Sequence, residues 1–154
     1  NHVISNLYIK SRANTDRLGL FSRLGGGVVK NLGVTSATVV SGLMALDASV
    51  ICGDMTISGD SIIESCYVSD SKVIVTSHNT YNNGNGAFLS NSLAKGTIRN
   101  CYVINSSIED MGIAGKRNAA ICTSVYSSNG VTVENCYSLF FIVKMTCMHG
   151  IIEI

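Results

Sequence analysis

Residues 98–103 read Ile-Arg-Asn-Cys-Tyr-Val, and a phrase of this form occurs five times along the 154-residue chain. Its first, fourth and sixth positions are largely apolar, its second is polar or charged, and its third is Asn in four copies and Ser in one. The copies lie near residues 4–9, 29–34, 63–68, 98–103 and 133–138. Their fourth positions are 25, 34, 35 and 35 residues apart. A period in this range is typical of one supersecondary unit stacked on copies of itself.

Each phrase reads as a short strand, because β-branched residues are dense and turn residues separate the runs. Two further extended segments accompany it in each unit, one near 37–40, 72–76 and 107–109, the other near 19–22, 50–53, 86–90 and 119–123. No stretch keeps a helical apolar period for more than about two turns. We therefore predict an all-β fold, a right-handed parallel β-helix of about five coils with three short strands per coil.

The repeats divide the chain into residues 1–138, the β-helix domain, and residues 139–154, a C-terminal cap or the start of a further coil. The chain starts at Asn1 without a methionine and enters the first phrase within three residues. We therefore expect it to be a piece of a longer protein, with any signal peptide or anchor outside it. Uncovered ends of a β-helix would invite end-to-end self-association.

Stacking assigns a structural role to each position of the phrase. The fourth positions would form an interior column of Leu7, Leu32, Cys66, Cys101 and Cys136. The third positions would form an amide ladder at a bend, with Asn6, Asn31, Asn100 and Asn135, and Ser65 in place of Asn. The second positions Lys30, Glu64, Arg99 and Glu134 alternate in sign, as an outward-facing parallel ladder should prefer.

Six cysteines would suggest disulfides in a short secreted chain. Three of them, however, occupy a slot that holds leucine in the earlier copies, and stacked strands about 4.8 Å apart do not bring parallel side chains into disulfide geometry. We therefore predict that Cys66, Cys101 and Cys136 are buried free thiols.

The segments Gly19-Leu20-Phe21-Ser22 with 27–32, and Gly86-Ala87-Phe88-Leu89-Ser90 with 96–102, resemble the GLUG repeat. That family's pattern runs roughly Gly-Gly-Leu-Val-Gly, a spacer, then Gly-x-Ile-x-Asn-Cys-Tyr. The resemblance covers about residues 1–138, although Ser22, Ser90 and Thr123 replace the closing glycine. It implies a bacterial, extracellular or cell-surface protein of the adhesin type, or a non-catalytic region of a secreted peptidase, and it implies no catalytic residues.

Two groups of residues are candidates for a ligand surface. The fifth positions Tyr67, Tyr102 and Tyr137, together with Tyr8 and broken by Gly33, should form an outward aromatic column able to meet sugar rings. The second group is Tyr81, Asn82 and Asn83, in a polar insertion between two strands, where binding residues of solenoids tend to lie.

Residues for catalysis or metal binding are sparse, and we expect no catalytic site, metal or cofactor. His2, His78 and His149 share no register, and the adjacent Cys147, Met148 and His149 cannot all face one ion. Two acid pairs, Asp54 with Asp60 and Asp70 with Glu109, would suit glycoside hydrolysis only if stacking brought them together.

Net charge and the length of the apolar runs limit the classes of binding partner. A net charge of +1 with 14% charged residues gives no basis for nucleic-acid binding, and the longest apolar run, residues 139–143, is far too short for membrane insertion. We expect a non-enzymatic structural or adhesive segment of a larger bacterial surface or secreted protein, with a host or matrix protein or a glycan as partner. The alternatives are a carbohydrate-binding or carbohydrate-active β-helix module and an accessory region of a secreted peptidase.

Overall fold

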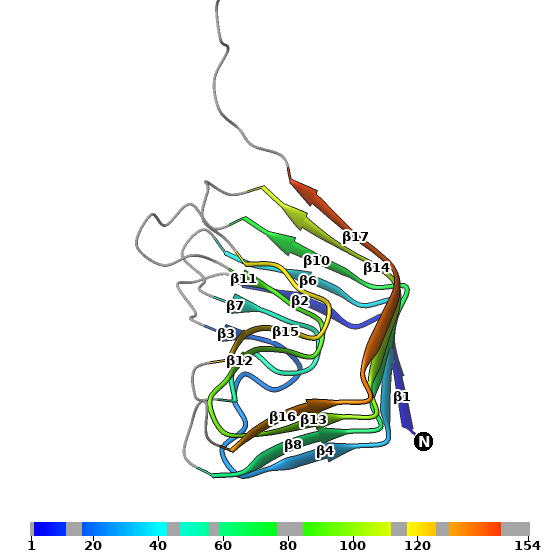
Figure 1. The fold of residues 1–154 in the computed structure, drawn as a ribbon. Helices are drawn as coiled ribbons and strands as arrows, with labels where there is room; N and C mark the ends of the chain where they lie inside the picture. The colour runs from blue at the N-terminus through cyan, green and yellow to red at the C-terminus, as the bar shows by residue number, and fades with distance from the viewer. Residues whose placement is uncertain are drawn as a thin grey trace, which may run out of the picture.

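The computed structural model describes residues 2–11, 17–42, 47–55, 59–76, 85–111, 117–125 and 130–145 (Figure 1). These residues form seventeen strands and no helix, which confirms the all-β prediction. Every strand pairing among them is parallel. The part of the chain described here contains no helix long and apolar enough to cross a membrane.

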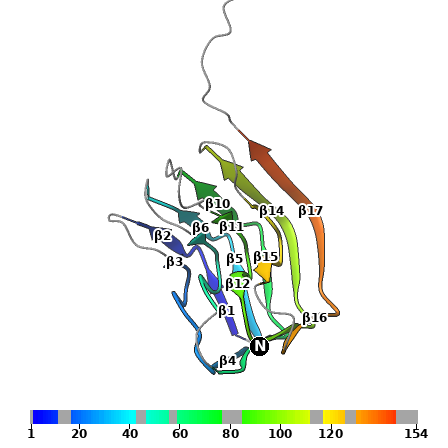
Figure 2. The ribbon, with the colours of Figure 1, turned by 60° about the vertical axis from the view of Figure 1, so that its left-hand side comes forward.

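The largest sheet has eight strands and bends sharply along its middle. Its order is β1-β5-β9-β14-β10-β6-β2, with β17 also paired to β14. The strands are β1 (His2–Ser5), β5 (Leu32–Thr35), β9 (Tyr67–Ser69), β14 (Tyr102–Asp110), β10 (Lys72–Val75), β6 (Thr38–Val40), β2 (Tyr8–Lys10) and β17 (Tyr137–Met145). The long strands β14 and β17 run through the bend and join its two halves, and Figure 2 shows them side by side with β10.

A second sheet has four strands, each of which comes directly before a strand of the eight-stranded sheet along the chain. Each of these four, together with the strands that follow it up to the next one and the segments that connect them, makes up one layer of the stack. The order of the second sheet is β16-β13-β8-β4. Its strands are β4 (Val28–Lys30), β8 (Ser61–Glu64), β13 (Gly96–Arg99) and β16 (Val131–Glu134).

Short strands complete the layers on the opposite side. They are β3 (Arg17–Leu18), β7 (Asp47–Ala48) and β11 (Asn85–Gly86) in one sheet, and β12 (Ser90–Leu93) and β15 (Cys122–Val125) in another. Isolated bridges continue these columns, including Phe21 to Cys52, Cys52 to Ser90 and Gly86 to Asn118.

Two corners turn the chain in each of the four later layers, and in the first layer β1 and β2 flank the second corner. Each corner is made by one residue in the left-handed region. The first corner, between the four-stranded and eight-stranded sheets, consists of Asn31, Ser65, Asn100 and Asn135, with φ between 50° and 56°. The second corner, at the bend of the eight-stranded sheet, consists of Asn6, Ser36, Asp70, Asn105 and Phe140, with φ between 48° and 59°. Asn and Asp tolerate this conformation best among residues with a side chain, which explains why the phrase has Asn at its third position.

The strand register places the first copy of the phrase one column away from its predicted position. Ile4 pairs with Val34, 30 residues on, and Tyr8 pairs with Thr38. The other copies stack as predicted, since Val29 pairs with Ile63, Ile63 with Ile98 and Ile98 with Val133. Residues 4–9 therefore form the second corner, not the first. Both corners need an apolar strand, one left-handed residue and another apolar strand, so the local pattern does not distinguish them.

Inward-facing apolar side chains form one cluster between the sheets. Residues at equivalent register positions lie above one another, and the fully buried ones include Val34, Val68 and Val103 in one column and Val39, Val73 and Ile108 in the next. Burial of such columns on one side of each strand is the main stabilising contribution expected for this fold.

Residues 139–145 continue the layer that begins at β16. Within β17, Leu139 pairs with Ile104 and Met145 with Asp110. The division after residue 138, where a cap or a further coil was predicted to begin, therefore falls inside a strand. Residues 139–145 belong to the same layer as β16.

Candidate functional site

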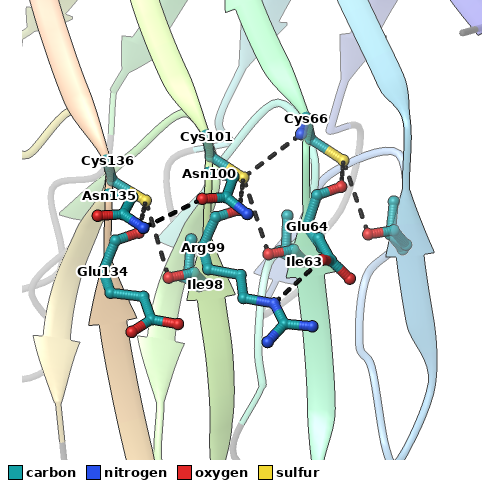
Figure 3. Close-up of polar contacts among 11 residues, drawn as sticks. Ile63, Glu64, Cys66, Ile98, Arg99, Asn100, Cys101, Glu134, Asn135 and Cys136 are labelled. Atoms are coloured by element: carbon teal, nitrogen blue, oxygen red, sulfur yellow. Dashed lines mark hydrogen bonds and ion pairs between the residues drawn. The ribbon is translucent and has the colours of Figure 1, made fainter.

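The first corner brings three ladders together (Figure 3). At its outer side lies the amide ladder, in which Asn135 Nδ2 donates a hydrogen bond of 3.3 Å to Asn100 Oδ1. Asn31 and Ser65 hold the same position in the earlier layers. Asn6 lies at the second corner instead, where its backbone N–H donates to the carbonyl of Thr35.

The cysteine column follows the amide ladder by one residue. It consists of Leu32, Cys66, Cys101 and Cys136, and Leu7 lies outside it because its segment belongs to the second corner. Each thiol sulfur lies 3.1–3.2 Å from the carbonyl oxygen two residues before it, within hydrogen-bonding distance. The five described cysteines, Cys52, Cys66, Cys101, Cys122 and Cys136, are all free. Cys147 lies outside the described residues.

Stacking changes the acidity of these thiols. The hydrogen bond between the Cys66 and Cys101 thiols lowers the pKa of Cys66 and raises the pKa of Cys101, because one thiol must keep its proton to donate it to the other. Burial adds to the rise at Cys101. In another column, burial raises the pKa of Cys52 to about 11.

The charge ladder lies on the outward face of the four-stranded sheet. Lys30 pairs with Glu64, Glu64 with Arg99, and Arg99 with Glu134. Arg99 Nε lies 3.1 Å from Glu64 Oε1. The hydrogen bond that Arg99 donates to Glu64, the charge of Glu64 and the more distant charge of Glu134 together raise the pKa of Arg99.

A second set of charges, not predicted from the sequence, lies beyond the second corner. Lys72 Nζ is 2.7 Å from Glu109 Oε1, across the pair β10 and β14. In the next layer Lys144 of β17 pairs with Glu109. The 35-residue separation of Glu109 and Lys144 equals the period of the phrase and could have revealed this column.

The tyrosine column is a stack of parallel rings. The centroids of Tyr67 and Tyr102 are 5.1 Å apart with 6° between the ring planes, and those of Tyr102 and Tyr137 are 5.4 Å apart with 10°. Below Tyr67 lies Gly33, where an added Cβ would overlap the Tyr67 ring. Tyr8 is not in this column, because it pairs with Thr38.

This geometry limits what the column can bind. A sugar ring stacks on the face of an aromatic ring, and both faces of Tyr67 and Tyr102 are already covered. Burial, then the neighbouring tyrosines, raise the pKa of Tyr102. Within the described residues, only the outer face of Tyr137 is covered neither by a ring nor by Gly33, and Tyr137 is 51% exposed. The predicted loop residues Tyr81, Asn82 and Asn83 lie outside the described residues.

The acids of the predicted catalytic pairs each have a separate partner. Asp54 is buried and lies 2.8 Å from Arg17 Nε, whereas Asp60 is exposed and lies 3.2 Å from Lys95 Nζ. Asp70 accepts a hydrogen bond from Asn105, and Glu109 is paired with Lys72. Among the described residues, no group of three or more His, Cys, Asp or Glu side chains is placed to hold a metal ion.

Other buried polar groups, which the sequence pattern does not indicate, lie on the side of the short strands. Asn85 Nδ2 donates to Asp47 at 2.9 Å, and Asn118 Nδ2 donates to Asp110 at 2.8 Å. These contacts lie beside the insertions, so they hold the loop ends in place.

Comparison with known proteins finds no matching family model, no matching curated protein and no matching solved structure. The resemblance to the GLUG repeat therefore stays a prediction, and the function is argued from the geometry.

Proposed function

We propose that this chain is a non-enzymatic structural segment of a larger bacterial cell-surface or secreted protein, in which a right-handed parallel β-helix of three strands per coil presents an adhesive surface. One observation carries the proposal: the residues of the repeated phrase contact their own copies in neighbouring layers. Each kind of group near the first corner provides such a contact. These contacts join Asn135 with Asn100, the Cys66 N–H with the Cys101 sulfur, Tyr67 with Tyr102, and Arg99 with Glu64. Side chains that are engaged in contacts between layers favour a structural role over a catalytic one.

The acids of the two predicted catalytic pairs also favour a structural role. General acid and base catalysis needs two carboxyl groups facing one substrate. The four acids of the predicted pairs instead contact Arg, Lys or Asn side chains. Location outside the cell rests on the resemblance to GLUG repeats. Burial of Cys66 and Cys101, though not of the half-buried Cys136, would protect these thiols from oxidation there.

The adhesive role is tested by coating beads with the full chain and measuring retention on host-cell layers and on immobilised matrix proteins. We expect saturable retention that the free chain competes away. A matched preparation of heat-unfolded chain controls for general stickiness. Retention no greater than that of the unfolded chain would refute adhesion, and release of reducing ends from a polysaccharide panel would refute the non-enzymatic assignment.

Carbohydrate binding is the second candidate, and the open face of Tyr137 favours it. A glycan array probed with the full chain should then give signals that Tyr137→Ala abolishes. Tyr102→Ala is the matched control, because that ring is covered on both faces and its loss removes no binding surface. Equal losses from both variants would count against a sugar site at Tyr137.

A further inference from the structure

The last layer of the stack, formed by β16 and β17, is uncovered within the described residues. Among the described strands, β17 pairs only with β14, and β16 ends the order of its sheet. Positions that are fully buried one layer earlier are exposed here: Ile98 is 0% exposed and its partner Val133 is 45%, while Ile108 is 0% and its partner Val143 is 38%. This open edge therefore exposes the interior of the fold.

The open edge also exposes large side chains that face outward or lie at the second corner. They are Tyr137, Leu139, Phe140 and Ile142; Met145, at an inward-facing position equivalent to buried Val75 and Asp110, is exposed as well. Together with the backbone groups along the free edge of a nine-residue strand, such a surface favours addition of another strand.

Charge specifies which strand would fit. The last three layers each carry one charge before the first corner and the opposite charge beyond the second corner, and the signs reverse from layer to layer. The pairs are Glu64 and Lys72, then Arg99 and Glu109, then Glu134 and Lys144. Glu109 and Lys144 share one register position, whereas Lys72 lies two residues before it. Contacts between layers join unlike charges. Arg99 lies on Glu64 in register. Glu109 lies on Ile74 and reaches Lys72 diagonally. The next layer should carry a cation at the first position and an acid at the second.

We propose that the open edge of β16 and β17 binds one parallel strand layer of a partner protein, with Lys or Arg opposite Glu134 and Asp or Glu opposite Lys144. The open face of Tyr137 would take an aromatic ring at the position between them. The proposal uses the strand register and does not depend on the adhesive role or the location of the protein.

A second copy of the chain fits the open edge less well. At the opposite end of the stack, β4 and β2 carry Lys30 and Lys10 at the positions equivalent to Glu134 and Lys144. Lys10 would therefore oppose Lys144. In addition β2 lies one layer beyond β4, because β4 shares its layer with β6, to which β2 pairs. The two strands cannot both contact the β16–β17 layer.

Antiparallel pairing of two copies through the same edge also fails. Superposing the corners would set Asn135 against Phe140 of the other copy. In that register Glu134 opposes Phe141 and finds no cation.

The test uses the full chain and a fluorescent peptide with the sequence of residues 96–110, in which Cys101→Ser prevents disulfide formation. Binding is followed by fluorescence anisotropy. The matched control peptide exchanges two of its three charged residues, Arg99→Glu and Glu109→Arg, and keeps Asp110, so its composition, length and net charge are unchanged. We expect saturable binding of the first peptide and about tenfold weaker binding of the second, from two pairs that change from unlike to like charge.

A variant of the chain locates the binding. Both Glu134 and Lys144 are exposed, and the double variant Glu134→Lys with Lys144→Glu should reverse the preference between the peptides. Equal binding of both peptides to the unaltered chain would overturn the proposal, as would an unchanged preference in a folded double variant. Self-association of the chain that neither peptide displaces would also overturn it, because a second copy would then occupy the edge. Should the double variant unfold, the two peptides on the unaltered chain still decide the question.

Discussion

Gly33→Ala tests whether the tyrosine column is covered on its inner end. The added Cβ would overlap Cζ, Cε1 and Oη of Tyr67. The ring cannot move away along the stack, because the Tyr102 centroid lies only 5.1 Å on the other side. Tyr67 must therefore swing out of the column.

The magnitude follows from two opposing effects. Loss of the Tyr67–Tyr102 stacking costs about 0.5–1.5 kcal/mol, and exposure of roughly 50 Å² of ring adds about 1 kcal/mol. Replacing a strand glycine by alanine returns about 0.5–1 kcal/mol, and Gly33 has no positive φ that would oppose it. We expect a net loss of about 0.5–2 kcal/mol, or roughly 1–8 °C in Tm for a chain of this length.

The assay is a double-mutant cycle by thermal and denaturant unfolding. With Tyr67→Ala the ring is gone, so Gly33→Ala should become neutral or stabilising by about 0.5–1 kcal/mol. Tyr67→Phe is the control, since its ring still overlaps the added Cβ and Gly33→Ala should remain harmful. The same cost of Gly33→Ala with and without the Tyr67 ring would refute the reasoning.

Three further outcomes are expected. Phe140→Asn should raise the free energy of unfolding by about 1 kcal/mol, because Asn tolerates the left-handed corner better. Phe140→Ala should raise it by less. Equal increases from both variants would show that removal of the exposed aromatic ring, not the backbone conformation, is the cause. Because burial raises the pKa of Cys52 to about 11, the unfolded chain loses this proton first, and stability should fall by about 2–3 kcal/mol between pH 9 and 11 in urea titrations. Cys52→Ala should flatten that fall, and an unchanged slope would contradict it. Iodoacetamide mapped by mass spectrometry should label Cys136 before Cys66 and Cys101, since only Cys136 lies in the open layer; simultaneous labelling would contradict the stack.

Much of the layer structure was predictable because it depends on local requirements that recur in every layer. A left-handed corner requires Asn or a similar residue, and an inward position requires an apolar side chain, so Asn100 and Cys101 identify their roles from sequence alone. The four later copies are also nearly evenly spaced, at 34, 35 and 35 residues, so their register follows from the sequence. The sign alternation of Glu64 and Arg99 is predictable for the same reason, since both residues hold the second position of the repeated phrase.

The position of the first copy was not predictable in this way. Its Asn6 satisfies the same backbone requirement as Asn31, and only the pairing of Ile4 with Val34 assigns it to the second corner. The charge column of Glu109 and Lys144 was missed for a related reason. Its residues lie outside the repeated phrase, and only the pairing of β14 with β17 makes them neighbours.

The sequence alone determined that this protein repeats a strand-and-corner unit, because periodicity and backbone preference are properties of short segments. The tertiary structure decided which corner each copy occupies, which tyrosine faces stay open and where the stack exposes its interior. These depend on contacts between residues about 35 positions apart, and a local pattern satisfied equally well by two corners cannot specify them.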